Sequence, residues 1–344
     1  MESRDIQDTD GEQEQPHRRC CIAYCDDENR FRIMGCPFDS FDDPEQGTPC
    51  PEAFVSKAAT GTVEYWKLSP PEKKSFDAAR KTELQNLLDL KAYRLLTLEE
   101  SLAFREKHPE YVLPSRWVDR WKPTDDGGVK AKSRIVILGF KDPHVLQLER
   151  SAPTPTHEAF TTTMQCFAST KRAAVSSDIK NAFGQSMKTS RQQKLACTLP
   201  PNLIEAGFKV DPRQLLICET EVYGLISGPS WLRQSLVADL QKLGYIVNKY
   251  DKCIMTLPST DGNVLNDGLV LIEVDDILEG GNERHQKQMA QFYQKYNCGK
   301  CKKLQDLGDE GTLISGIRVI QHKDYSFTWH MKEYAEKMLS LIHI

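Results

Sequence analysis

One stretch of the chain, LVLIEVDDILEGG at 269–281, places two adjacent aspartates inside an otherwise apolar run. A run this apolar and β-branched is typical of a buried β-strand. Burial of an unpaired carboxylate is unfavourable, and two neighbouring carboxylates also repel each other. The stretch therefore predicts two strands joined by a tight turn at Asp275–Asp276, where both carboxylates reach one edge of a sheet and need a counter-charge.

Two more acidic residues belong to this prediction. By strand alternation, Glu273 is expected to share a face with Asp275. Asp178 closes a short apolar strand in SSDIKNAF at 176–183. A divalent cation is the usual counter-charge for carboxylates held close together. Asp178, Asp275 and Asp276 are therefore candidate ligands of a two-metal site for phosphoryl or nucleotidyl transfer.

The formal net charge of −4 conceals an uneven distribution. Residues 1–55 include 14 acidic and 5 basic residues, so the rest of the chain has 35 acidic and 40 basic residues. Within that rest, 115–141 has seven basic and three acidic residues. The acidic leader at 1–55 is expected to be poorly ordered. The locally basic body is compatible with a phosphate-rich partner.

Hydrophobic periodicity and turn residues predict helices interleaved with short strands. A helix is expected over 69–96, with Ser69 as its N-cap and prolines in its first turn. PTDDGG at 123–128 predicts a hairpin within 115–141. The other expected elements are a strand passing into a helix at 173–183, helices at 228–245 and 282–296, and strands on both sides of a turn between 251 and 281. This interleaving predicts an α+β fold with a largely antiparallel sheet.

Membrane and disulfide-rich classes are not predicted. No apolar run approaches the ~20 residues of a membrane-spanning helix, and the N-terminus is acidic, unlike a secretory signal. Most of the 11 cysteines stand singly, which favours reduced thiols in an intracellular protein. CGKC at 298–301 lacks the second cysteine pair of a zinc site and is interpreted as structural. His285 is interpreted as a helix-surface residue.

Six segments occur in an order that carries a family resemblance. They are WVDRWK (117–122), KSRIVILGF (132–140), DIKNAF (178–183), YGLISGPSW (223–231), VDDI (274–277) and DLG (306–308). Through these segments the chain resembles the reverse transcriptase region of copia-type retrotransposon Pol polyproteins, over residues 69–340. The family's segments read Trp-Val-x-x-x-Lys, Lys-Ala-Arg-Leu-Val-x-x-Gly-Phe, Asp-Val-Lys-x-Ala-Phe, Tyr-Gly-Leu-Lys-Gln-x-Pro-x-x-Trp, Tyr-Val-Asp-Asp and Asp-Leu-Gly.

The resemblance implies a right-hand polymerase with fingers and a palm, the palm being an antiparallel sheet flanked by helices. Composition and resemblance together divide the chain into a disordered acidic leader at 1–55, a helical segment at 56–112 leading into the fingers, and fingers and palm at 113–344. The family continues into connection and RNase H domains, so the chain is expected to be truncated before them. The implied activity is RNA-directed DNA polymerisation, a nucleotidyl transfer that copies an RNA or DNA template into DNA.

The resemblance also implies roles for individual residues. Asp178, Asp275 and Asp276 would be catalytic and would hold two Mg²⁺ ions, with Mn²⁺ as the alternative. One ion would lower the pKa of the primer 3′-hydroxyl, and the other would neutralise the triphosphate and the leaving pyrophosphate. The implied nucleotide-binding residues are Lys132, Arg134, Ala182, Phe183, Tyr223, Gly224 and Pro229.

Three of these nucleotide-binding residues have a plainer alternative role. Lys132 and Arg134 would clamp the triphosphate, or else be solvated charges on an edge strand. Phe183 would exclude a ribose 2′-hydroxyl, or else be a core residue. Gly224 and Pro229 would shape the floor of the pocket.

The implied partners are an RNA template, a DNA primer and product, dNTPs and other parts of the Pol polyprotein such as integrase and RNase H, with no membrane. The implied location is a cytoplasmic particle, the nucleus or both. Glu273 departs from the family, which has an aromatic residue before Val-Asp-Asp. A carboxylate there would repel the primer phosphate or join the metal shell. The alternative function is therefore a decayed or repurposed fragment that binds nucleic acid without efficient polymerisation.

Overall fold

The computed structural model describes residues 20–25, 31–36, 62–124, 127–262, 266–299, 301–314 and 316–342. Contacts divide the chain into two units, Met1–Thr60 and Gly61–Ile344. In the first unit, β1 (Cys20–Cys25) pairs antiparallel with β2 (Phe31–Cys36), a pair that the sequence does not predict. The prediction of disorder for the remainder of 1–55 falls outside the described residues.

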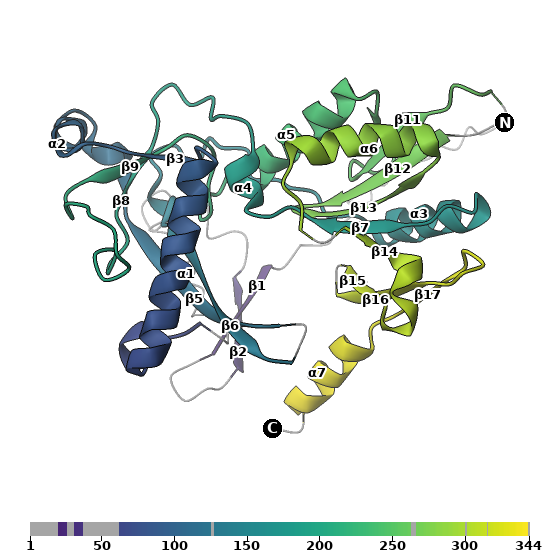
Figure 1. Cartoon of the computed structure of the whole chain (residues 1–344), viewed down its shortest axis with the longest axis horizontal. Coiled ribbons are helices and arrows are strands. Elements are labelled where there is room, and N and C mark those ends of the chain that lie inside the picture. The colour runs from purple at the N-terminus through teal and green to yellow at the C-terminus, as the bar shows by residue number, and fades with distance from the viewer. Residues whose placement is uncertain are drawn as a thin grey trace, which may run out of the picture. The chain divides into compact units, whose positions relative to one another are not determined.

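A six-stranded sheet forms the centre of one half of the second unit (Figure 1). Its strand order is β10-β11-β12-β13-β7-β14, and all of its pairs are antiparallel. The strands are β7 (Val175–Asp178), β10 (Ile246–Val247), β11 (Ile254–Pro258), β12 (Asn266–Glu273), β13 (Asp276–Gly281) and β14 (Lys302–Lys303). The predicted antiparallel sheet and α+β class are confirmed.

Helices cover both faces of this sheet because β12 is apolar on both sides. Val270 and Ile272 pack in one buried cluster with α5 (Gly228–Lys242) and α6 (Glu283–Lys295). Leu269 and Leu271 pack in another cluster with α3 (His157–Ser169). Figure 1 shows α5 and α6 on one side of the sheet and α3 on the other.

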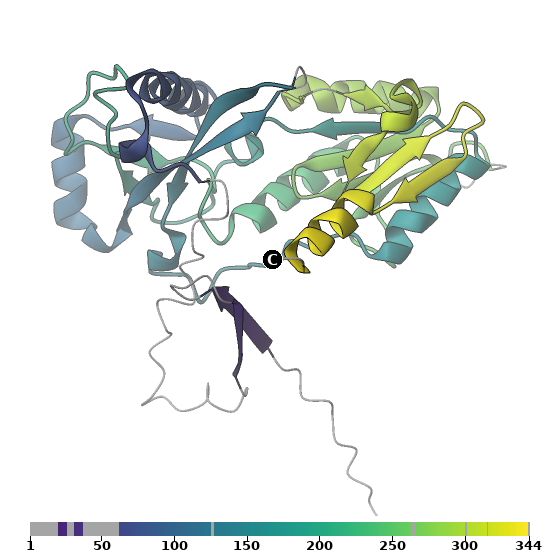
Figure 2. The ribbon, with the colours of Figure 1, turned by 90° about the horizontal axis from the view of Figure 1, so that it is seen from below.

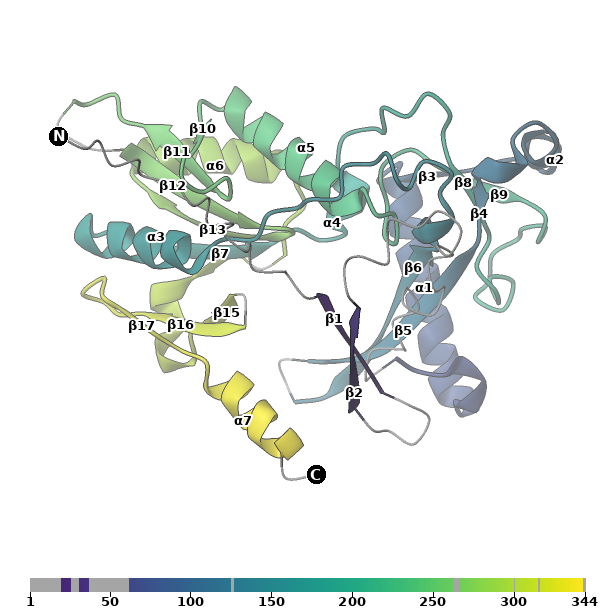
Figure 3. The same cartoon turned by 180° about the vertical axis from the view of Figure 1, so that it is seen from behind.

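A second group of elements surrounds helix α1 (Pro70–Asp89). A capping box at Ser69 and Glu72 starts this helix, as the Ser-Pro-Pro segment predicts. The helix lies along the hairpin of β5 (Ser115–Pro123) and β6 (Val129–Ile137), as Figure 2 and Figure 3 show. A four-stranded sheet of order β3-β9-β8-β4 packs beneath it, made of β3 (Tyr93–Leu95), β4 (Val112–Leu113), β8 (Ala196–Thr198) and β9 (Leu215–Cys218).

The remaining elements lie at the edges of these two groups. They are α2 (Leu98–Lys107), α4 (Ala182–Gln185), α7 (Lys332–Ile342) and a three-stranded sheet of β15 (Thr312–Ile314), β16 (Ile317–Gln321) and β17 (Phe327–His330). Among the helices described, none combines the length and the apolar character needed to cross a bilayer. Six cysteines of the second unit are free thiols: Cys166, Cys197, Cys218, Cys253, Cys298 and Cys301.

Candidate functional site

The turn between β12 and β13 differs from the predicted turn by one residue. Strand β12 ends at Glu273, and β13 begins at Asp276, so the turn consists of Val274 and Asp275. Val274 has a φ of +54°, a left-handed conformation that is strained for a β-branched residue. The backbone N–H of Ile179 donates to the Asp275 carbonyl at 3.0 Å, which fixes the turn against the end of β7.

This geometry corrects the predicted facing of Glu273. Glu273 lies opposite Asp276 in the strand register, and Asp276 lies opposite Asp178. Glu273 and Asp276 line one small cavity, whereas Asp275 lines a different and larger one. The prediction from strand alternation is wrong here because the strand ends at Glu273. The chain reverses at Val274, so Asp275 belongs to the turn and not to the strand.

The larger cavity has a volume of about 710 Å³ and lies between the two groups of elements. Asp178 and Asp275 contribute acidic groups from the ends of β7 and the β12–β13 turn. The opposite wall comes from α1 and the β5–β6 hairpin. Its basic members are Lys122, Lys130, Lys132 and Arg134, and Lys180 adds a cation beside Asp178. One cavity therefore joins a carboxylate wall to a cationic wall.

The aspartates repel one another electrostatically. Burial raises the pKa of Asp276 to about 6, and the charges of Asp275, Asp178 and Glu273 add to that rise. Burial also raises the pKa of Asp275, with Asp178 and Glu273 adding to it and Arg134 opposing it. Each carboxylate thus disfavours the ionisation of its acidic neighbours.

An aromatic pair connects the cationic wall to the loop after β7. The Arg134 guanidinium lies over the Tyr223 ring, 5.2 Å from its centroid. The Tyr223 ring meets the Phe183 ring edge-on, with centroids 4.6 Å apart. Phe183 is half-buried at the start of α4. The cavity thus gathers Lys132, Arg134 and Tyr223 with Asp178 and Asp275, and Tyr223 places Phe183 at its border.

The other predicted nucleotide-binding residues act as scaffold in this geometry. Gly224 has a φ of +94°, and a Cβ there would lie 2.0 Å from the Ile137 carbonyl oxygen. Only glycine permits this contact between the Tyr223–Gly224 segment and the end of β6. Ala182 is fully buried, and Pro229 lies in the first turn of α5. Gly224, Ala182 and Pro229 support the cavity without lining it.

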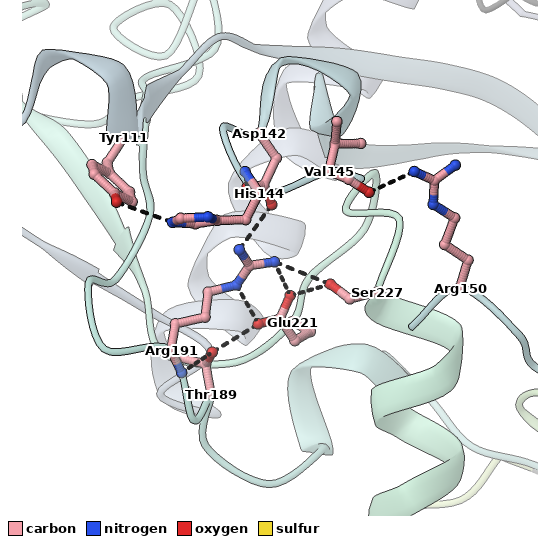
Figure 4. Close-up of polar contacts among 9 residues, drawn as sticks. All are labelled: Tyr111, Asp142, His144, Val145, Arg150, Thr189, Arg191, Glu221 and Ser227. Carbon is pink, nitrogen blue, oxygen red and sulfur yellow. Dashed lines mark hydrogen bonds and ion pairs between the residues drawn. The ribbon is translucent and has the colours of Figure 1, made fainter. Parts of the chain in front are cut away.

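A buried ion network that the sequence does not predict holds the loops beside the cavity. Arg191 donates to both oxygens of Glu221 at 2.7 and 2.9 Å and lies 2.8 Å from Asp142 Oδ2 (Figure 4). Arg191 and Glu221 each contact the Ser227 hydroxyl, just before α5. Burial opposes ionisation of Glu221, but its bonds with Arg191 and Ser227 outweigh burial and lower its pKa. The network ties together three loops and the start of α5.

His285 is buried, contrary to the prediction of a helix-surface residue. Its Nε2 lies 2.6 Å from Glu279 Oε2, and its Nδ1 lies 2.8 Å from the Tyr245 hydroxyl. Both partners are also buried. The side chain of His285 fits between Gly268 and Gly281, where any Cβ would approach it within 2.4 Å. His285 therefore has a structural role in the packing of α6 on the sheet.

The carboxylates provide the hard oxygen ligands that Mg²⁺ prefers. Asp178 and Asp275 share one cavity wall, and Asp276 is the direct strand neighbour of Asp178. Within the described part of the chain, no three His, Cys, Asp or Glu side chains converge into a formed metal site. The residues fit the ion in the chemistry of their ligands, and the Mg²⁺ site remains a prediction.

The raised pKa of Asp276 predicts that removing this carboxylate stabilises the fold. Between pH 3.8 and about 6 the folded state binds more protons than the unfolded chain, so it loses stability as pH rises through that window. Asp276 is partly desolvated but still more than a third exposed, so solvent screening reduces the full shift of about 3 kcal/mol to about 1 kcal/mol. We expect Asp276→Asn to raise the free energy of unfolding by that amount at pH 8 and to leave it unchanged at pH 3.5, measured by urea unfolding.

The exposed Asp309 provides the control for this measurement. Asp309→Asn should leave the free energy of unfolding unchanged at pH 8 and at pH 3.5. If Asp276→Asn raised the free energy of unfolding equally at both pH values, its effect would not come from the repulsion between the aspartates.

The chain matches no protein-family model and no curated protein sequence.

Proposed function

We propose that this chain is an RNA-directed DNA polymerase domain of a copia-type retrotransposon, with a right-hand arrangement of fingers and palm. The observation that supports the proposal best is the 710 Å³ cavity. The family resemblance assigns Asp178 and Asp275 to the metals and Lys132 and Arg134 to the triphosphate. These four residues come from three separate segments of the sequence and line the same cavity.

In this proposal the cationic wall of the cavity binds the nucleotide and the carboxylate wall binds the metal. Lys132 and Arg134 bind the triphosphate of the incoming dNTP, with Arg134 oriented by its stacking on Tyr223. Phe183, held by the same Tyr223 ring, borders the sugar and excludes a 2′-hydroxyl. When bound to the carboxylates, Mg²⁺ supplies the charge that activates the primer 3′-hydroxyl and stabilises the leaving pyrophosphate. Template and primer are bound mainly through their phosphates, so their affinity falls with salt.

A decayed or repurposed copy that binds nucleic acid without efficient synthesis is the second candidate. Glu273 favours it, because its carboxylate adds negative charge beside Asp276. The carboxylates of Asp178, Asp275 and Asp276 favour the active polymerase.

Primer extension tests the two candidates directly. The full chain should add dNTPs to a DNA primer on an RNA template in Mg²⁺, prefer dNTPs over rNTPs, and stop when the metal is chelated. Glu273→Tyr should raise the rate, because it removes a negative charge beside Asp276. If the natural chain gives only background extension while Glu273→Tyr extends the primer, the polymerase proposal fails for this chain. The second candidate, a decayed copy that binds nucleic acid without efficient synthesis, is then supported.

A further inference from the structure

Arg191 is a nearly buried cation that the proposed mechanism does not use. Its side chain is 11% exposed, and it lies between the Glu221 and Asp142 carboxylates, whose side chains are 4% and 1% exposed. Arg191 donates to both oxygens of Glu221, and its Nη1 lies 2.8 Å from Asp142 Oδ2 (Figure 4). A guanidinium binds carboxylates in a fixed geometry because its donors form a rigid planar fork. Arg191 therefore holds the loops of these two acids together.

These two loops continue into the segments that carry the stacked pair of Arg134 and Tyr223. Asp142 follows the end of β6, the strand that carries Arg134. Glu221 lies two residues before Tyr223. The two segments also contact each other directly, because the Ile137 N–H at the end of β6 donates to the Tyr223 carbonyl at 2.9 Å. Buried ion pairs and a backbone hydrogen bond thus fix Tyr223 relative to β6.

The far end of the Tyr223 segment is fixed at Ser227. Arg191 Nη2 donates to the Ser227 hydroxyl at 3.1 Å. Ser227 directly precedes α5, whose first residue, Gly228, contacts the Phe183 ring so closely that a Cβ there would lie 3.3 Å from Phe183 Cδ1. Tyr223 meets the same ring edge-on, with centroids 4.6 Å apart. Phe183 therefore packs against two residues of one segment, and Arg191 holds that segment.

From these contacts we infer that Arg191 is a positioning residue, which fixes Tyr223 and the start of α5 and thereby sets the position of the Phe183 ring that distinguishes dNTP from rNTP. The role of Phe183 toward the sugar rests on the proposed function, whereas the contacts that fix Tyr223 do not depend on polymerisation. A ring that excludes a 2′-hydroxyl acts by its exact place. A small displacement should therefore change the preference for dNTP more than the rate with dNTP.

The kinetic test uses Arg191→Lys, which keeps the positive charge but lacks the planar fork. Primer extension by the full chain in Mg²⁺ gives kcat and KM for dATP and for ATP. Arg191→Lys should lower the dATP-to-ATP ratio of kcat/KM about tenfold, with kcat for dATP changed less than about twofold. Arg213→Lys, the same replacement in an exposed ion pair, is the matched control and should leave the ratio unchanged.

A double variant separates positioning from a general loss of structure. In a Tyr223→Ala background, Arg191→Lys should have little further effect on the dATP-to-ATP ratio, because both residues act through one set of contacts. A purely structural role of Arg191 predicts equal losses with both nucleotides, and effects that add. Thermal unfolding of each variant shows that it is folded.

Amide hydrogen exchange on the nucleotide-free chain tests the contacts without polymerase activity. The Ile137 N–H exchanges when its bond to the Tyr223 carbonyl opens, so Arg191→Lys should speed this exchange about tenfold. The N–H of Ile179, which donates to the Asp275 carbonyl, is the internal control and should exchange as in the natural chain.

An active Arg191→Lys chain with an unchanged dATP-to-ATP ratio would overturn the inference and leave the polymerase proposal intact. So would unchanged exchange at Ile137. If Arg191→Lys does not fold, Ser227→Ala decides by the same measurements: it keeps the ion pairs and should lower the ratio about threefold, through loss of one hydrogen bond. A natural chain that extends no primer, together with faster exchange at Ile137 alone in the variant, would refute the polymerase proposal and support the positioning of Tyr223 by Arg191.

Discussion

Asp275→Asn is expected to reduce primer extension by about 10³-fold or more, because this carboxylate would hold the catalytic Mg²⁺, whose charge stabilisation is worth several kcal/mol. Asp275 is the member of the aspartate pair that lines the large cavity, and its backbone carbonyl anchors the turn to β7. The Asn side chain preserves that shape and removes the negative charge. The loss should therefore occur in kcat, measured by single-nucleotide extension with saturating dNTP in Mg²⁺.

Two comparisons make this result specific to the site. Asp178→Asn, on the same cavity wall, should cause a similar loss, whereas Asp309→Asn, at an exposed position far along the chain, should cause none. Thermal unfolding should show Asp275→Asn as stable as the natural chain or more so, because burial and its acidic neighbours raise the pKa of Asp275. Retention of most of the natural rate by Asp275→Asn would contradict a metal-dependent mechanism at this turn.

Local patterns were sufficient to predict the elements that carry the site. The Ser-Pro-Pro start of α1, the β5–β6 hairpin, the strand ending at Asp178, helix α5 and the strand pair around the aspartates all occur near their predicted positions. Each of them has a signal within a few residues: a cap, a turn, or an apolar run ended by charge. Helix α1 nevertheless ends at Asp89, before the predicted 96, because β3 begins at Tyr93 and pairs with β9.

The features that the sequence did not predict depend on distant partners. Glu221 and His285 are buried polar residues whose ion-pair partners, Arg191 and Glu279, lie more than five residues away in the sequence. The direction of Glu273 relative to Asp275 depends on the positive φ of Val274. The alternation of side chains along a strand does not predict such an angle. The ends of the strands thus determine the site more than their interiors do, and they are the least predictable part of the pattern.

The ion pair between Arg80 of α1 and Asp119 of β5 is expected to be the strongest single polar contact holding the cationic wall in place. Their side chains are 4% and 3% exposed, and Arg80 Nη2 lies 2.6 Å from Asp119 Oδ2. The guanidinium also lies over the Tyr65 ring, 3.8 Å from its centroid. Asp119→Ala would leave the buried Arg80 charge with only the more distant Asp77 carboxylate, 3.8 Å away, as a counter-charge, so the free energy of unfolding should fall by about 3 kcal/mol in urea unfolding.

The double variant Arg80→Met with Asp119→Leu separates the value of the pair from the cost of breaking it. Replacement of both charges by apolar side chains of similar volume should recover most of the stability, since no charge then remains buried. The exposed pair Lys332–Glu336 is the control, and Glu336→Ala there should cost less than about 1 kcal/mol. If Asp119→Ala is no more destabilising than Glu336→Ala, α1 is held on the hairpin by its apolar contacts alone. Phe76, fully buried with its ring edge-on to Trp121 at 4.7 Å, would then be the residue that fixes the wall of the cavity.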